Sequence, residues 1–162
     1  MSDVLKILIV GEGPVADALA PMVGVLGWGA TTATTLAESE AAIHSVDAVV
    51  VTSHHEDVDG PAIRAALAAG TSYVGAMGSR RTQARRREWL LANGVTERAL
   101  DALHAPIGLD IGADAPGEIA VSILAEIVAV RRGADAAVTS ISDRDGAIHP
   151  DQQPGEAYCP GG

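Results

Sequence analysis

The sequence contains no phenylalanine, and two tryptophans and two tyrosines are its only aromatic residues. The core of this 162-residue chain must therefore be built from Ala, Val, Ile and Leu. The shortage of rings argues against binding single-stranded nucleic acid, whose bases stack on aromatic side chains. Cations are also scarce, with 11 Lys and Arg against 21 Asp and Glu, a net charge of −10. This acidic balance argues against duplex DNA, so we expect no nucleic-acid partner.

Cysteine and long apolar runs are scarce as well. The single cysteine, Cys159, excludes an internal disulfide framework and suits a reducing compartment. The apolar run Ile7–Val10 is too short for a signal peptide. The longest apolar helix candidate, Ile119–Val130, is too short to span a bilayer and contains Glu126. We therefore expect a soluble, cytoplasmic protein without a membrane partner.

Strand-like and helix-like segments alternate along the chain. The expected strands are 6–10, 30–34, 47–52 and 71–75, the expected helices are 14–26, 36–44, 61–69, 79–92, 96–103 and 116–132, and an irregular loop is expected at 104–115. Strands separated by helices predict parallel βαβ units. We therefore expect an α/β fold, a Rossmann-like doubly wound parallel sheet in a single domain over residues 1–133. Residues 134–162 lose this periodicity, which predicts an irregular or partner-docking tail.

One cluster of cations stands out in this acidic chain. Five of its 11 Lys and Arg residues lie within positions 80–87, after a glycine turn and a serine N-cap. A helix N-terminus offers free N–H groups to an anion, and glycines let a phosphate approach the backbone. The candidate phosphate contacts are Gly75, Gly78, Ser79, Arg80 and Arg81. Arginines 85–87 are expected on the exposed helix face. The alternative is that the whole cluster is a solvated basic face.

The turn after the first expected strand fits the dinucleotide-binding pattern G-x-G-x-x-G/A through Gly11, Gly13 and Ala16. In that pattern an acid at the end of the second strand holds the ribose hydroxyls. Residues 31–35 contain no acid, and Glu38 is better placed in the first turn of a helix, where acids are favoured. Gly11 and Gly13 remain candidate cofactor contacts, although classical NAD binding is disfavoured. The alternative is that these glycines only let the strand turn into its helix.

Imidazoles and carboxylates gather in 53–59, directly after the third expected strand. Ligands of parallel sheets bind beyond the carboxyl ends of strands, which makes His54 a candidate ligand contact. We expect no metal site, because the chain has no HxxxH, HExxH or CxxC pattern. His104 is isolated and is expected to be an ordinary surface or loop residue. No GxSxG elbow or P-loop occurs, so no catalytic residue is predicted.

Two longer motifs carry a resemblance to a known family. They are His104–Ala113, which reads HAPIGLDIGA, and Pro116–Ala129, which reads PGEIAVSILAEIVA. With Tyr73–Arg80 and Ser53-His54, they resemble the C-terminal Rossmann-like domain of the XdhC/CoxI family, the accessory proteins of xanthine and carbon monoxide dehydrogenases. The likeness covers about residues 5–133. The chain departs from the family at Glu12 and Pro14 in the first turn, at Ala115 where Thr is usual, and in lacking the strand-two acid.

The resemblance implies a function. It indicates a non-catalytic accessory protein, a maturation chaperone that binds the molybdenum cofactor, an anionic pterin phosphate or dinucleotide, for a molybdenum hydroxylase apoenzyme. Asp110 would then accept hydrogen bonds from pterin N–H groups, unless it only stabilises its turn. Family members carry a further N-terminal domain, so we expect a separate N-terminal-half partner or a specialised paralogue, and a homodimer is a further expectation. The alternatives are an NAD(P)-dependent oxidoreductase and a nucleotide-sensing regulatory module.

Overall fold

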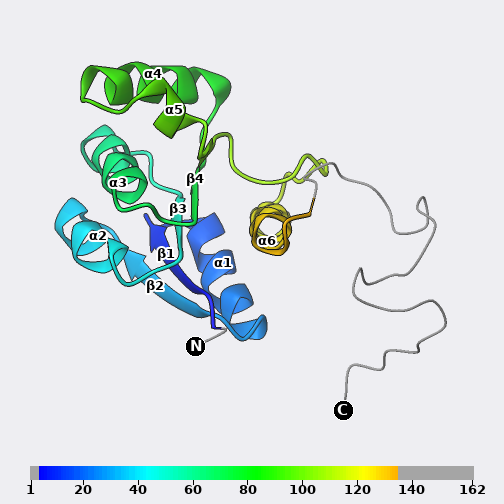
Figure 1. Cartoon of the computed structure of the whole chain (residues 1–162). Coiled ribbons are helices and arrows are strands. Elements are labelled where there is room, and N and C mark those ends of the chain that lie inside the picture. Colours follow the sequence, from blue (N-terminus) through cyan, green and yellow to red (C-terminus); the bar gives the residue numbers. More distant parts are fainter. Residues whose placement is uncertain (1–3, 135–162) are drawn as a thin grey trace, which may run out of the picture.

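Five parallel strands in the order β2-β1-β3-β4-β5 form the centre of the computed structural model, which describes residues 4–134 (Figure 1). The strands are β1 (Lys6–Val10), β2 (Gly29–Ala33), β3 (Ala48–Val51), β4 (Tyr73–Ala76) and β5 (Leu103–His104). The helices are α1 (Pro14–Val25), α2 (Leu36–Ile43), α3 (Glu56–Ala68), α4 (Arg80–Ala92), α5 (Glu97–Leu100) and α6 (Pro116–Arg132). This confirms the expected Rossmann-like α/β fold. The expected tail, 134–162, lies outside the described residues except for Ala134.

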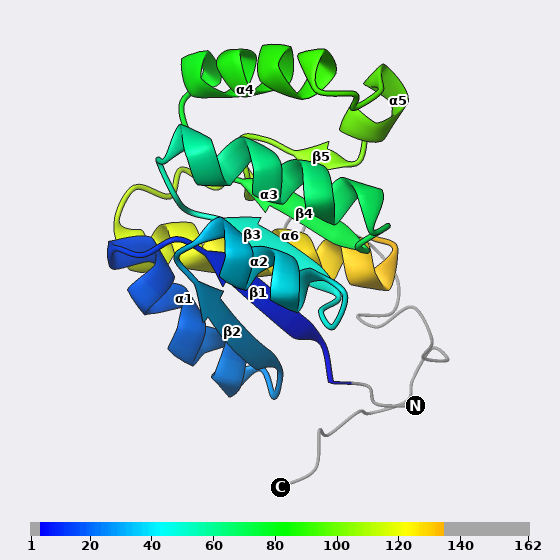
Figure 2. The ribbon, with the colours of Figure 1, turned by 90° about the vertical axis from the view of Figure 1, so that its left-hand side faces the viewer.

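Helices cover both faces of the sheet, as the apolar strands require. Side chains alternate between the two faces of a strand. Leu8, Val49 and Val74 pack under α2 and α3, whereas Ile9 and Val50 pack under α1 and α6. In Figure 2, α2 and α3 face the viewer, α6 lies behind the sheet, and α4 runs along the β5 edge. The core is aliphatic apart from Tyr73, as the composition predicts.

The structure corrects two expected elements. Helix α3 begins at Glu56 and not at Pro61, because its acidic residues stand in the first turn, where the helix dipole favours them. Residues 103–104 form the short strand β5 and not the end of a helix and the start of a loop. This strand pairs with β4 through Val74↔Leu103 and Gly75↔His104, a stretch too short for a period-two pattern.

The carboxyl ends of the parallel strands all lie at one edge of the sheet. The strands are parallel, so every β–α connection leaves from the same, carboxyl edge. After β1 the chain enters α1 on one face, and after the neighbouring β3 it enters α3 on the other. In sheets of this kind, ligands bind where neighbouring connections diverge.

No helix within residues 4–134 is long and apolar enough to span a membrane.

Candidate functional site

Nearly all the candidate ligand contacts lie at this carboxyl edge. They are Gly11 and Gly13 after β1, His54 after β3, Gly78, Ser79, Arg80 and Arg81 after β4, and Asp110 after β5. The register Val10↔Val51 and Val51↔Ala76 keeps the ends of the three central strands level. The fold therefore gathers residues that are up to 99 positions apart in the sequence, from Gly11 to Asp110.

The turn after β1 is tightly packed at Gly11 and open at Gly13. Gly11 has φ +122°, and a Cβ added there would lie 2.6 Å from the backbone nitrogen of Ser53. Gly13 has φ +118°, and a Cβ there would meet nothing within 4 Å. Gly13 is the N-cap of α1, which no side chain caps. Packing against Ser53 explains the glycine at position 11, whereas the surroundings of Gly13 are open. The two glycines are therefore not equivalent.

The acid nearest the end of β2 is occupied elsewhere. Glu38 accepts hydrogen bonds from the backbone nitrogens of Thr34 at 2.8 Å and Thr35 at 3.2 Å. These bonds lower the pKa of the Glu38 carboxyl below its ordinary value. Thr35 in turn accepts from the Glu38 nitrogen, which completes a capping box at the start of α2. The expected position of Glu38 in the first turn of a helix is confirmed, and the capping box is an addition from the structure.

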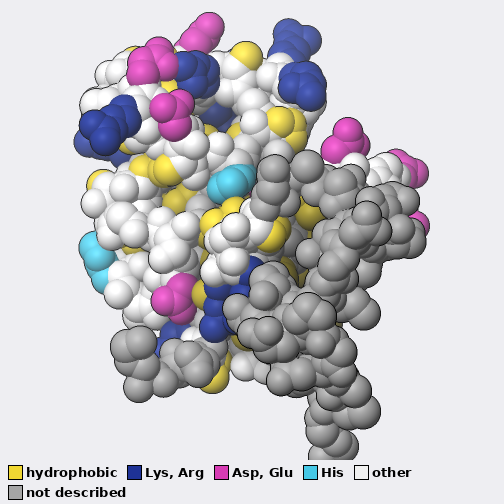
Figure 3. All heavy atoms as spheres, turned by 45° about the vertical axis from the view of Figure 1, so that its right-hand side comes forward, with side chains coloured by type: hydrophobic (Ala, Val, Ile, Leu, Met, Phe, Trp, Pro, Cys, Tyr) yellow, Lys and Arg dark blue, Asp and Glu magenta, His cyan; other side chains and the backbone are white. Residues whose placement is uncertain are grey.

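The N-terminus of α4 combines a capped turn with two arginines that have no side-chain partner in the described part of the chain. The Ser79 hydroxyl accepts from the Thr82 nitrogen at 3.1 Å, which confirms the predicted N-cap. Arg80 and Arg81 are exposed, and neither makes an ion pair or side-chain hydrogen bond with any residue in 4–134. The three later arginines of α4 each form an ion pair with a carboxylate: Arg85 with Glu56, Arg86 with Asp59 and Arg87 with Glu97. Figure 3 shows these mixed charges at the top of the molecule, over α4.

Arg86 corrects the prediction that arginines 85–87 are exposed. Arg85 and Arg87 are exposed, but the Arg86 side chain is only 8% exposed. Its guanidinium pairs with Asp59 at 2.8 Å and donates to the carbonyls of Ser53 at 3.2 Å and of Met77. Arg86 therefore links α4 to α3 and to the chain segments that follow β3 and β4.

A small hollow of about 250 Å³ opens between the turn after β4 and the loop after β5. Gly78 lies on one side, and Asp110, which is exposed, lies on the other. The loop is anchored at its start, where the Ile107 nitrogen donates to the Ala76 carbonyl at 3.1 Å, and at Leu109, whose nitrogen donates to the Ser122 carbonyl at 3.2 Å. The fold thus brings Gly78 and Asp110 to one cavity.

His54 and Gly75 lie apart from that hollow. His54 is exposed and lines a different hollow, of about 730 Å³, between α3 and α4 beside Trp89. Gly75 is buried within β4, where an added Cβ would lie 2.6 Å from Ile107 Cδ1 and 2.9 Å from the Tyr73 hydroxyl. Packing therefore explains this glycine without a ligand. No three His, Cys, Asp or Glu side chains in the described part of the chain are grouped to hold a metal ion.

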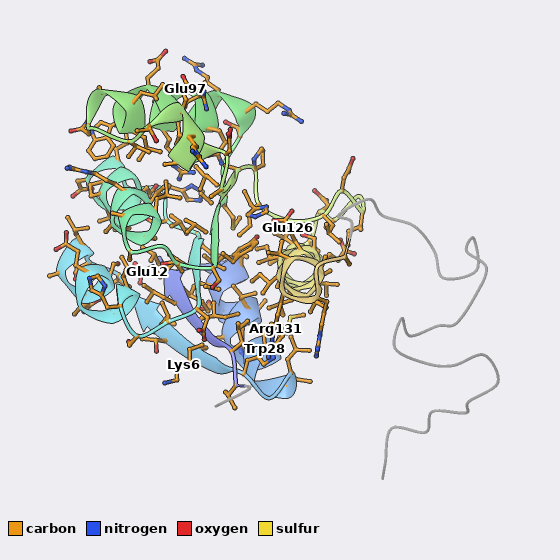
Figure 4. All side chains as sticks on the ribbon, viewed as in Figure 1. Lys6, Glu12, Trp28, Glu97, Glu126 and Arg131 are labelled. Carbon is orange, nitrogen blue, oxygen red and sulfur yellow. The ribbon has the colours of Figure 1, made fainter. Side chains whose placement is uncertain are left out.

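A buried polar cluster that the sequence did not predict supports the β5–α6 loop. The Tyr73 hydroxyl donates to Glu126 Oε1 at 2.6 Å, and the Gly108 nitrogen donates to the same oxygen at 3.2 Å. His104 stacks on the Tyr73 ring at 4.6 Å, with its Nδ1 3.5 Å from Glu126 Oε1. Figure 4 shows Glu126 between α6 and the loop. The expectation that His104 is an ordinary surface or loop residue is wrong, because the short strand β5 brings it against Tyr73.

The Tyr73 phenol should not ionise in the folded protein near pH 10, the usual pKa of tyrosine. Burial, and then the hydrogen bond and charge of Glu126, raise the pKa of Tyr73. A raised folded-state pKa gives a stabilising contribution that is complete below about pH 10 and is lost as the pH rises through the folded value. In a Tyr158→Phe background, phenolate absorbance should therefore appear only together with alkaline unfolding seen by circular dichroism. Half-titration near pH 10 in a still folded protein would contradict this assignment.

The parallel sheet, the divergence of the connections after β1 and β3, and the glycine turn that leads into α1 define a Rossmann-like domain. Residues 7–127 match the family model described as the XdhC Rossmann domain. The chain therefore belongs to the XdhC family, as the resemblance predicted.

Three similar proteins are longer than this chain. It is 30% identical to the uncharacterized protein YqeB of Escherichia coli (strain K12), over 80% of this chain and 28% of that protein. It is 29% identical to the molybdenum cofactor insertion chaperone PaoD of the same strain, over 78% of this chain and 40% of PaoD. It is 37% identical to a probable xanthine dehydrogenase subunit of Bacillus subtilis (strain 168), over 53% of this chain and 24% of that protein.

A solved structure shares the fold. The crystal structure of a xanthine dehydrogenase from Bacillus halodurans superposes with a TM-score of 0.64 and 24% identity, covering 82% of this chain and 46% of that one. The chain thus spans less than half the length of each of these relatives.

Proposed function

We propose that this chain binds the molybdenum cofactor at the carboxyl edge of its sheet, as a non-catalytic accessory protein in the maturation of a molybdenum hydroxylase of the xanthine or carbon monoxide dehydrogenase type. Membership of the XdhC family and the 29% identity to the chaperone PaoD support this role. The proposal concerns a ligand with an anionic phosphate and a pterin ring.

The observation that carries the proposal is the difference among the five arginines of α4. Arg85, Arg86 and Arg87 are neutralised by carboxylates of the same chain, whereas Arg80 and Arg81 have no such partner within residues 4–134. The two lie at the N-terminus of α4, where free N–H groups and the helix dipole also favour an anion. A phosphate bound there would accept charge-assisted hydrogen bonds from both guanidinium groups.

The pterin end of such a ligand would bind in the hollow beside Gly78. Asp110 on its rim would accept hydrogen bonds from ring N–H groups, and Gly78 would let the ligand approach the turn. At about 250 Å³ the hollow is below the usual 300–1,000 Å³ of sites that enclose a whole ligand. This chain would therefore hold part of the cofactor. A separate N-terminal-half protein, or the molybdenum hydroxylase apoenzyme itself, would cover the rest.

The second candidate is an NAD(P)-dependent oxidoreductase, and the turn after β1 favours it. Gly13 leaves an open approach to the uncapped start of α1, as a dinucleotide pyrophosphate requires. Against it, Glu38 is engaged in the capping box and residues 31–35 supply no other acid for the ribose. A nucleotide-sensing module without chemistry would use the same turn.

Calorimetric titration distinguishes these functions. The chain should bind molybdenum cofactor released from a molybdoenzyme. Arg80→Ala with Arg81→Ala should weaken that binding by about 30- to 150-fold, the loss expected for two charge-assisted contacts at roughly 1–1.5 kcal/mol each. The matched control, Arg85→Ala with Arg87→Ala, removes the same charge from the same helix and should change binding by less than about threefold.

Two outcomes would overturn the proposal. Equal losses in both double variants would mean that general charge, and not the start of α4, attracts the ligand. Tight binding of NADH with hydride transfer to any substrate, in the absence of cofactor binding, would establish the oxidoreductase instead.

A further inference from the structure

The outer face of α6 lacks the charged residues that normally cover an exposed helix. Between Glu118 and Arg131 the only charged residue is Glu126, whose side chain is buried against the sheet. On the outer face Val121 is 46% exposed and Val128 is 38% exposed. A helix that is apolar on all sides is normally buried on all sides. The outer face of α6 therefore has the character of an interface.

Five residues on the outer face of α6, four exposed and Ala125 half-buried, have the spacing of a two-helix contact, whereas the exposed Val130 and Arg131 line a separate hollow beside Val4. We call the five residues the α6 stripe: Glu118, Val121, Ala125, Val128 and Arg132. Its members are separated by three, four, three and four residues, the a/d spacing at which two helices pack side by side. Ala125 at the centre is small enough to let a second helix approach closely.

The two ends of the stripe lie symmetrically about Ala125, with the acid Glu118 seven residues before it and the base Arg132 seven residues after it, and the valines lie four residues before and three after. If a second α6 packs antiparallel across a two-fold axis at Ala125, Val121 of each copy meets Val128 of the other. The same operation places Glu118 of each copy opposite Arg132 of the other. An isologous dimer requires a surface that is complementary to itself, and this stripe is.

Both end residues are able to make this pair. Glu118 caps α6 through Oε1 alone, which accepts from the nitrogens of Asp114 at 3.1 Å and Ala115 at 2.9 Å, and Oε2 has no partner among residues 4–134. Arg132 likewise has no ion pair or side-chain hydrogen bond with the described residues. The neighbouring Arg131 is engaged differently, with its guanidinium 5.7 Å from the Trp28 ring; Figure 4 shows the two side by side.

We propose that the α6 stripe is a homodimer interface in which two copies of this chain pack α6 against α6 in antiparallel orientation. The contact buries the two valines of each copy and forms two Glu118–Arg132 pairs. It also brings each helix N-terminus beside the C-terminus of its partner, where the dipoles attract. The inference rests on α6 alone and does not depend on which ligand the carboxyl edge takes.

Sedimentation equilibrium of the full chain at micromolar concentrations tests this interface. The parent chain should dimerise, and Val128→Glu should raise the dissociation constant at least about tenfold by placing charge in the contact. The matched control is Val25→Glu, at a valine on α1 that is 87% exposed and outside the stripe, and it should leave the constant unchanged.

Charge reversal identifies the antiparallel register. Arg132→Glu alone and Glu118→Arg alone should each weaken the dimer, because like charges then face each other. The double variant should restore it. Loss of the Glu118 cap is common to Glu118→Arg and the double variant, so it cannot produce the recovery between them. A parent chain that stays monomeric would overturn the proposal and assign the stripe to residues 135–162 or to another protein. A dimer insensitive to Val128→Glu, or a double variant without recovery, would also overturn it.

Discussion

Arg86→Met should lower the free energy of unfolding by about 3–5 kcal/mol, the usual cost of removing one partner of a buried ion pair. The Asp59 side chain is 3% exposed and would stay buried without the guanidinium that now lies 2.8 Å away. The carbonyls of Ser53 and Met77 would lose a donor at the same time. Urea denaturation followed by circular dichroism measures the change.

A surface arginine of the same helix provides the control. Arg85 pairs with Glu56 at 3.4 Å, but these side chains are 62% and 83% exposed. Exposed pairs contribute at most about 1 kcal/mol, so Arg85→Met should have a small effect. Adding Asp59→Leu to Arg86→Met should recover part of the loss, because no unpaired carboxylate then remains. If Arg86→Met were as mild as Arg85→Met, Arg86 would not be the buried link described above.

This arginine also connects stability to the candidate site. Met77 directly precedes Gly78, and Ser53 directly precedes His54. A single guanidinium therefore holds the backbone from which two candidate contacts extend, while Arg80 and Arg81 have no ion-pair partner among residues 4–134. Within residues 4–134, the basic cluster of α4 thus divides into a buried arginine that holds this edge and two exposed arginines at the start of the helix that form no ion pair.

Much of the fold follows from local sequence signals. The β-branched runs that form β1 and β3, the Ser79 cap and the place of Glu38 in the first turn of α2 each depend on residues within a few positions of one another. Propensity and capping act over that range, which is why these features could be predicted. The start of α3 was misplaced because Pro61 resembles a first-turn proline although it lies inside the helix.

The features that were missed depend on tertiary contacts. Arg86 and Asp59 are 27 positions apart and meet only because α3 and α4 lie side by side. Tyr73 and Glu126 are 53 positions apart, and the sequence around neither residue indicates that the two side chains meet. A buried arginine and a surface arginine look the same in a sequence. The only signal in the sequence was an acid, Asp59, in the helix that precedes the cation-rich helix.

Gly11→Ala should destabilise the protein by about 2–6 kcal/mol, the sum of backbone strain and overpacking. The strain arises because Gly11 has φ +122°, which L side chains rarely adopt. The overpacking arises because the new Cβ would lie 2.6 Å from the Ser53 nitrogen and 2.7 Å from Thr52 Oγ1. The first contact is with backbone at the end of β3, so relief requires β1 and β3 to separate at the candidate site.

Gly13→Ala separates these two causes, because Gly13 has nearly the same φ, +118°, and an open surrounding. It should cost only the strain, about 1–3 kcal/mol, so the difference between the variants in urea denaturation measures the clash. Equal losses would show that the turn relaxes around the Gly11 methyl group.

Ligand binding by the folded Gly13→Ala variant distinguishes the two candidate ligands. A methyl at Gly13 occupies the approach to α1 without disturbing the strands, so weaker NADH binding in folded Gly13→Ala would favour a dinucleotide at this turn. Unchanged binding of molybdenum cofactor in the same variant would favour a ligand held by α4 and the β5–α6 loop.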